Sequence, residues 1–197
     1  MSASLSPEMR KALARAALAV AAAKSWRAAT IDDLAHAAGV SAADLYPAGL
    51  ADAVECVEEG FDRAMAGRSG QANETVRDRL FDILMRRFEA MEPVRKAVLA
   101  MEEGQDRDPT LMAAMHQRHV RAARWALTLA GLDADGMSGG ARAQGLAIII
   151  GQARAAWRGD DAGDFAKTMA SLDKNLRRAE EMFGRWAGFE TKAIGAD

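Results

Sequence analysis

The sequence is poor in residues that end helices or cross-link chains. Its 197 residues include four prolines, one tyrosine and one cysteine. The single cysteine, Cys56, excludes a disulfide framework and a thiolate metal cluster within one chain. Strand signals are nearly absent, whereas alanine is abundant. The sequence therefore predicts an all-α protein in which Cys56 is a buried structural residue.

Long apolar runs are also missing. No stretch approaches the roughly 20 apolar residues that are needed to cross a bilayer. Arg15 and Lys24 bracket the alanine-rich run 16–23, a pattern that does not fit a cleavable signal segment. With 50% apolar residues and a net charge of −2, the composition is typical of a globular protein, which we expect in the cytoplasm.

Motifs for catalysis are scarce. Of the three histidines, only His116 and His119 lie one helical turn apart, and no His-Glu-x-x-His motif accompanies them. The sequence contains neither a glycine-rich phosphate loop with lysine nor a nucleophile elbow. We therefore expect that the protein is not an enzyme and holds no cofactor and no metal, with His116 and His119 on a polar helix face.

The most informative stretch is TIDDLAHAAGVSAADLYPAGLA, which begins at Thr30. Thr30 with Asp33, and Ser41 with Asp44, have the spacing of N-terminal capping boxes. Gly39 stands where a chain that leaves a helix often needs positive φ. Two helices of about two turns each, joined by a tight turn that contains glycine, indicate a helix-turn-helix.

This stretch and its flanks resemble the N-terminal domain of TetR-family transcriptional regulators. The similarity runs from about residue 12 to residue 65 and rests on the corner Lys24-Ser25-Trp26, the motif Thr-Ile-x-x-Leu-Ala-x-x-Ala-Gly-Val-Ser and the Leu-Tyr pair after it. The resemblance implies a three-helix DNA-binding head on an all-helical body that dimerises and holds a small effector. The predicted DNA-binding residues are Lys24, Arg27, Thr30, Ser41, Ala42, Asp44 and Tyr46.

Composition and resemblance together divide the chain into three parts. We expect a helix-turn-helix head over residues 1–50, a connecting helix over 51–67, and a helical effector-binding and dimerisation domain over 68–197. The small and polar stretch GRSGQAN, residues 67–73, is the expected linker.

Apolar periodicity predicts the helices of the body. In the last one, residues 165–186, apolar side chains alternate steps of four and three over about three heptads, which indicates a seam for a partner helix. We expect this helix and the helix over 141–157 to form a four-helix interface in a homodimer; the alternative is that both pack on their own body. The residues 136–140, rich in glycine, are expected to break the chain between helices. The predicted interface residues are Ile148, Phe165, Met169, Leu172, Leu176 and Phe183.

Eleven methionines supply soft and adaptable apolar surface. They either line a cavity for a small apolar effector or fill the core. If a cavity exists, we expect it between residues 84 and 125. The predicted lining residues are Leu84, Phe88, Met101, Met112, Met115 and Trp125.

The charge of the expected head opposes DNA binding. Residues 1–66 carry six basic and nine acidic side chains, a net charge of −3. DNA-binding proteins need cations that neutralise phosphates. No lysine or arginine lies between Arg27 and Arg63, and Ala42 and Asp44 cannot replace an arginine fork on guanine. The sequence therefore predicts a weak DNA site.

Two short segments support an alternative. The interruption Tyr46-Pro47-Ala48-Gly49 and the stretch from Trp157 to Asp161 resemble ubiquinone-biosynthesis lipid-binding proteins, which look like TetR folds with degenerate heads and no DNA role. In this alternative the body holds an isoprenoid or other lipid. A basic last helix would then touch an anionic membrane through Lys167, Lys174, Arg177, Arg178 and Arg185.

Overall fold

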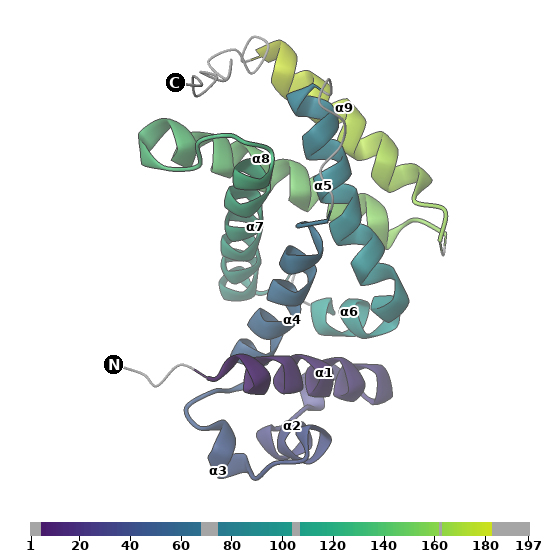
Figure 1. Ribbon diagram of the computed structural model, residues 1–197. Helices are drawn as coiled ribbons and strands as arrows, with labels where there is room; N and C mark the ends of the chain where they lie inside the picture. Colours follow the sequence, from purple (N-terminus) through teal and green to yellow (C-terminus); the bar gives the residue numbers. More distant parts are fainter. Residues whose placement is uncertain (1–4, 68–74, 104–106, 162, 183–197) are drawn as a thin grey trace. The chain divides into compact units, whose positions relative to one another are not determined.

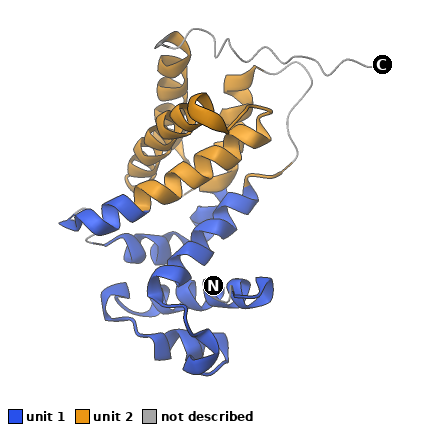
Figure 2. Cartoon of the chain, turned by 90° about the vertical axis from the view of Figure 1, so that its left-hand side faces the viewer, with its two compact units in different colours: residues 1–64, 89–114 blue, residues 65–88, 115–197 orange. Residues whose placement is uncertain are grey.

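The computed structural model describes residues 5–67, 75–103, 107–161 and 163–182, which form helices and turns without a strand (Figure 1). The all-α prediction is confirmed. The helices group into two compact units (Figure 2): unit 1 comprises residues 1–64 and 89–114, and unit 2 comprises residues 65–88 and 115–197. The expected linker lies outside the described residues except for Gly67, and the three-part division stays a prediction.

In unit 1, the helix α1 (Pro7–Ala23) contacts α2 (Ile31–Ala38), α4 (Leu50–Ala64) and α6 (Arg95–Glu102). The hydroxyl of Ser6 caps α1 by accepting the N–H of Met9 at 3.2 Å, and Pro7 takes the first helical position. Small side chains on its inner face let three helices approach it closely. The buried residues of α1 are Leu13, Ala16, Ala17, Val20 and Ala21.

The remaining elements of unit 1 are short. The 3-10 turn η1 (Trp26–Ala28) follows α1, α3 (Ala42–Leu45) lies between α2 and α4, and η2 (Glu92–Val94) precedes α6. On α4, Cys56 is buried as predicted, and this burial raises the pKa of its thiol.

Unit 2 contains α5 (Val76–Met91) up to Phe88, α7 (Pro109–Leu129) from Met115, α8 (Gly136–Arg158) and α9 (Ala166–Met182). α8 packs along α9. Asp160 holds the start of α9, because its carboxylate accepts the N–H groups of Lys167 at 2.7 Å and Thr168 at 2.8 Å. No described helix has the length and apolar character that crossing a bilayer requires. Fully buried side chains in this unit include Leu80, Leu84, Phe88, Leu127, Ile150, Trp157, Leu172 and Leu176.

Two predicted helix boundaries are wrong. Residues 136–140 do not break the chain but form the first turns of α8, which starts after the N-cap residue Asp135. Glycine serves there for close approach, because Gly139 lies directly against the backbone of Ala134. At the other boundary, Phe165 has φ 52 and lies outside α9, which begins one residue later. Trp186, the expected end of that helix, lies outside the described residues.

We predict that Gly139→Ala destabilises the protein. A Cβ atom at residue 139 would lie 2.3 Å from the carbonyl carbon of Ala134, which is backbone and cannot turn away. We expect the free energy of unfolding, measured with urea, to fall by about 1–3 kcal/mol. The matched control is Gly140→Ala, whose Cβ would meet nothing nearer than the Arg124 guanidinium at 3.9 Å. This control should be neutral or stabilising by up to about 1 kcal/mol; equal losses in both variants would contradict the packing argument.

Candidate nucleic-acid interface

The helix-turn-helix in unit 1 has the predicted turn. α2 ends at Gly39, which adopts the left-handed conformation with φ 71 and ψ 31. The Gly39 N–H donates to the carbonyl of His36 at 3.2 Å, and the Val40 N–H donates to that of Ala35 at 3.0 Å. These bonds satisfy the last carbonyls of α2 and lead the chain to Ser41, where α3 begins.

Both predicted capping boxes are confirmed. At α2, the Thr30 hydroxyl accepts the Asp33 N–H at 3.2 Å, and the Asp33 carboxylate accepts the Thr30 N–H at 2.8 Å. At α3, Ser41 and Asp44 make the same two bonds at 3.2 and 3.0 Å. Each box satisfies two N–H groups that a helix start leaves without a partner.

The second helix of the motif is shorter than expected. α3 has four residues, about one turn rather than two. Tyr46 leaves the helix with φ −59 and ψ 134, because a residue before proline is excluded from the helical region, and the Tyr46–Pro47 peptide is cis. Leu45 is buried and anchors the turn, whereas Tyr46 is 84% exposed. The predicted base-reading surface is therefore one turn with Ala42 and Asp44, followed by an exposed tyrosine.

The two cations next to the motif are engaged within unit 1. The ammonium of Lys24, at the end of α1, lies 2.5 Å from the Asp33 carboxylate. The Arg27 guanidinium, on η1, donates to the carbonyl of Glu103 at 3.4 Å. Phosphate would have to compete with these groups for both side chains.

Two further cations on α1, Arg10 and Lys11, are also paired. Arg10 donates through two nitrogens to Glu59, a bond that raises the pKa of Arg10, and Arg63 reaches the same carboxylate at 3.3 Å. Lys11 pairs with Glu8 at 3.0 Å. Arg15 is exposed and has no ion pair with a described residue. The acidic head thus uses most of its positive charge internally.

The carboxylates of the capping boxes remain ionised to low pH. Lys24 first, and then the Thr30 hydroxyl and N–H, lower the pKa of Asp33 to about 2. The hydroxyl and the N–H of Ser41 lower the pKa of Asp44. Both residues therefore contribute full negative charge to this surface at neutral pH.

The six residues predicted to line an effector pocket are divided between the two units. Met101, buried, and Met112, 53% exposed, belong to unit 1. The others belong to unit 2, where Leu84, Phe88 and Met115 are buried and Trp125 is 38% exposed. The pocket built from these six residues stays a prediction.

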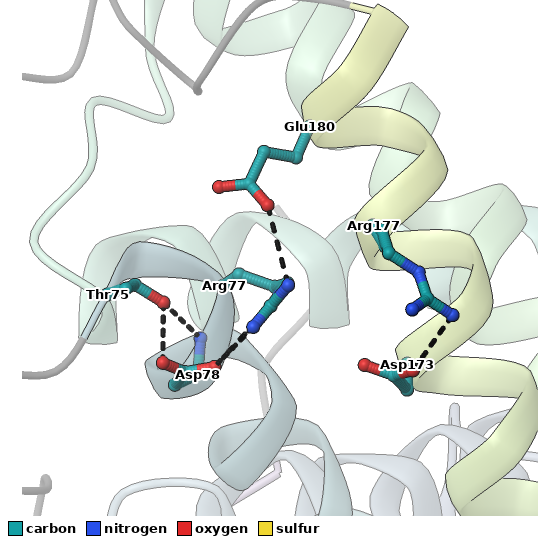
Figure 3. A network of polar contacts seen from close by, with 6 residues as sticks. All are labelled: Thr75, Arg77, Asp78, Asp173, Arg177 and Glu180. Atoms are coloured by element: carbon teal, nitrogen blue, oxygen red, sulfur yellow. Dashed lines mark hydrogen bonds and ion pairs between the residues drawn. The ribbon is translucent and has the colours of Figure 1, made fainter.

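A groove of about 420 Å³ lies between α5 and α9 of unit 2. Ion pairs flank it (Figure 3): Arg77 reaches Asp78 at 3.2 Å and Glu180 at 3.6 Å, and Arg177 reaches Asp173 at 3.3 Å. The sequence does not predict this groove, because apolar residues at helical spacing look the same whether they fill a core or line a groove. Its lining residues are Arg77, Asp78, Phe81, Met169, Ala170, Asp173 and Leu176.

The predicted dimer residues differ in exposure. Ile148 is 55% exposed and Met169 is 40% exposed, so both offer apolar surface. Leu172 and Leu176 are completely buried within unit 2 and leave no surface for a second copy, which corrects their assignment to the interface. Phe165 is partly buried outside the helix, and Phe183 lies outside the described residues.

The two neighbouring histidines do not form a metal site among the described residues. His116 Nε2 lies 2.8 Å from the side-chain oxygen of Gln144, and His119 is buried. No group of three or more potential metal-ligating side chains occurs in the described part of the chain.

Comparison with known proteins identifies the fold. No protein-family model matches the sequence, and no curated protein is significantly similar to it. Among solved structures, the TetR transcriptional regulator from Nitrosomonas europaea ATCC 19718 is similar, with a TM-score of 0.67 and 21% sequence identity. The match covers 88% of this chain and 98% of that chain. The chain therefore has a TetR-like fold, as its helix-turn-helix motif predicts.

We predict a pH-dependent contribution of Asp33 to stability. Its carboxyl has an ordinary pKa of 3.8 and a pKa of about 2 in the folded protein. The stabilisation is therefore fully present above pH 4 and is lost as the pH falls towards 2. Urea unfolding of wild type and Asp33→Asn from pH 2 to 7 should show a stability difference that shrinks below pH 4. A difference that is constant over this range would contradict the assignment.

Proposed function

We propose that this TetR-like chain is a transcriptional repressor that binds double-stranded DNA as a homodimer, in the cytoplasm, and is released by a small apolar effector. The observation that carries the proposal is the helix-turn-helix, in which two capping boxes and the Gly39 turn are formed as the sequence predicts. Two copies would place their heads in successive major grooves of a pseudo-palindromic site.

We propose a small number of contacts between the helix-turn-helix and DNA, most of them polar. Lys24 and Arg27 neutralise phosphates beside the groove, and the Tyr46 hydroxyl donates to a phosphate oxygen. The Thr30 hydroxyl donates to Asp33 at 2.7 Å and would have to leave that carboxylate to reach a phosphate. On α3, the Ala42 methyl suits a thymine methyl, and the Asp44 carboxylate suits the amino group of cytosine; Ser41 positions both. Because Lys24 and Arg27 must first leave their intramolecular partners, we expect weak binding that falls further as the salt concentration rises.

We propose that the effector binds in unit 2. The groove between α5 and α9 has a volume of about 420 Å³, within the range of small-molecule sites, and Phe81, Met169 and Leu176 give it an apolar lining. An effector can release DNA only if it binds the DNA-free arrangement of the protein more tightly. The core methionines near residues 84–125 are a second place where such a ligand can be sought.

For the dimer, we propose an interface on the exposed side of α8 and α9. These helices pack against each other within the subunit, and Ile148 of α8 and Met169 of α9 remain exposed. A two-fold copy of the pair would complete a four-helix interface.

One set of observations favours a second candidate function, a lipid-binding accessory protein without DNA binding. The recognition helix has a single turn, and Lys24 and Arg27 are engaged within unit 1. α9 also presents exposed cations that suit an anionic membrane surface. Those described are Lys167, Lys174, Arg177 and Arg178, whereas Arg185 lies outside the described residues. Mass spectrometry of lipids extracted from the purified protein tests this function directly.

We predict that the protein binds the intergenic DNA upstream of its own gene more tightly than a scrambled duplex. Fluorescence anisotropy at 50 and 200 mM salt measures both affinities. Arg27→Ala should reduce the salt slope by roughly one, because one phosphate contact is lost. Tyr46→Ala should weaken binding by about 1 kcal/mol through loss of one hydrogen bond.

The matched control is Lys96→Ala, since Lys96 is an exposed cation on α6 outside the helix-turn-helix. This variant should bind like wild type. Binding to neither duplex at low salt, together with a co-purified lipid, would replace the regulator by the lipid-binding function.

We predict that Ile148→Glu converts the dimer into a monomer. A carboxylate at this exposed position of α8 would be buried without a partner when two copies associate. Sedimentation velocity at micromolar concentration measures the change. Leu111→Glu is the control, because Leu111 is 43% exposed on α7, a helix that is not part of the proposed interface. A wild-type protein that is already monomeric would rule out this dimer.

A further inference from the structure

The two capping boxes of the helix-turn-helix have the same backbone bonds but different charge environments. In each, one carboxylate oxygen accepts both the N–H and the hydroxyl of the residue that caps the helix: Thr30 for Asp33 at 2.8 and 2.7 Å, and Ser41 for Asp44 at 3.0 and 2.7 Å. Only Asp33 also holds a cation, because the Lys24 ammonium lies 2.5 Å from the same oxygen. Asp44 has no ion pair with a described residue. The chain thus contains one capping box with a lysine and one without.

The ion pair between Lys24 and Asp33 is open to competition. Their side chains are 39% and 31% exposed, so solvent and salt screen the attraction, and a pair of this kind contributes little to folding. An amide oxygen at position 33 would still accept the Thr30 N–H, so removing the charge weakens the box but keeps its capping bond. The negative charge of Asp33 therefore has a consequence for Lys24 that is separable from capping.

The consequence for Lys24 is a weaker interaction with the phosphates of DNA. A lysine that gives one N–H to a carboxylate keeps two donors, but its charge is already compensated, so it releases less counterion on meeting DNA. In a head of net charge −3 with six basic side chains, Lys24 and Arg27 are the only cations between Arg15 and Arg63, so this pair engages one of the two cations next to the helix-turn-helix.

We propose that Asp33 sets the DNA affinity of unit 1 by holding Lys24 in an ion pair that a phosphate must break. This inference rests on the proposed DNA-binding function. Asp33 is a positioning residue here: it acts through Lys24 and touches no base. Removing its charge while keeping its capping oxygen releases Lys24 to the DNA backbone.

The test is a double-mutant cycle of wild type, Asp33→Asn, Lys24→Met and the double variant. Anisotropy titrations use the upstream and the scrambled duplex at 50 and 200 mM salt. Asp33→Asn should bind both duplexes more tightly, with a salt slope steeper by about 0.9, so that its advantage falls about threefold between the two salt concentrations. In the Lys24→Met background, the same substitution should give no gain. Urea unfolding confirms that all four proteins are folded.

Asp32→Asn is the charge-matched control, because Asp32 is an exposed carboxylate of α2 that has no ion pair with a described residue and no proposed DNA contact. Its salt slope should equal that of wild type. An equal steepening in Asp32→Asn, or a gain from Asp33→Asn that persists in the Lys24→Met background, would show a general charge effect and overturn the inference. Specific wild-type binding that Asp33→Asn leaves unchanged would remove this inference alone. Binding by none of the proteins would remove the proposed function and the inference with it.

Discussion

Two short helices of unit 1 depend on the capping boxes at their N-termini. α2 has eight residues and α3 has four, lengths at which an isolated helix does not persist in water. The reciprocal bonds of Thr30 with Asp33 and of Ser41 with Asp44 satisfy the N–H groups that such helices leave open. Leu34 and Leu45, both completely buried, then fix the two helices in the core of unit 1. Without the caps, the N–H groups at the starts of α2 and α3 would lose these partners, and packing alone would hold both segments helical.

The same carboxylates oppose the function that the fold suggests. They place negative charge on the surface that would meet phosphate, and Asp33 also engages Lys24, while Glu59 engages Arg10 and Arg63. A single head of this kind has little electrostatic attraction for DNA. Two heads joined in a dimer would bind far more tightly than one, since the second contact becomes intramolecular. The acidic head therefore makes the proposed DNA binding depend on dimerisation. If the protein does not dimerise, the lipid-binding alternative is left.

In unit 2, the packing of α8 decides which apolar residues remain available. Gly139 brings the start of α8 against the preceding backbone, and Leu172 and Leu176 of α9 are buried in the core of the unit. Met169 is left at the edge of the groove beside α5, and Ile148 is left on the exposed side of α8. The apolar residues of α8 and α9 thus supply the core, the groove and the candidate interface, and for this reason we propose both a ligand and a partner copy for this part of unit 2.

The sequence by itself determined the features that depend on residues three or four positions apart. These are the all-α character, both capping boxes and the turn at Gly39, because each is fixed by local backbone bonds. Pro47 also carried the local signal for the one-turn α3. Only the tertiary structure decided which carboxylate engages each cation, as with Arg10 and Glu59, 49 residues apart. It also decided which heptad residues are core and where the groove lies, because burial depends on the helices that pack alongside and periodicity records only that one face is apolar.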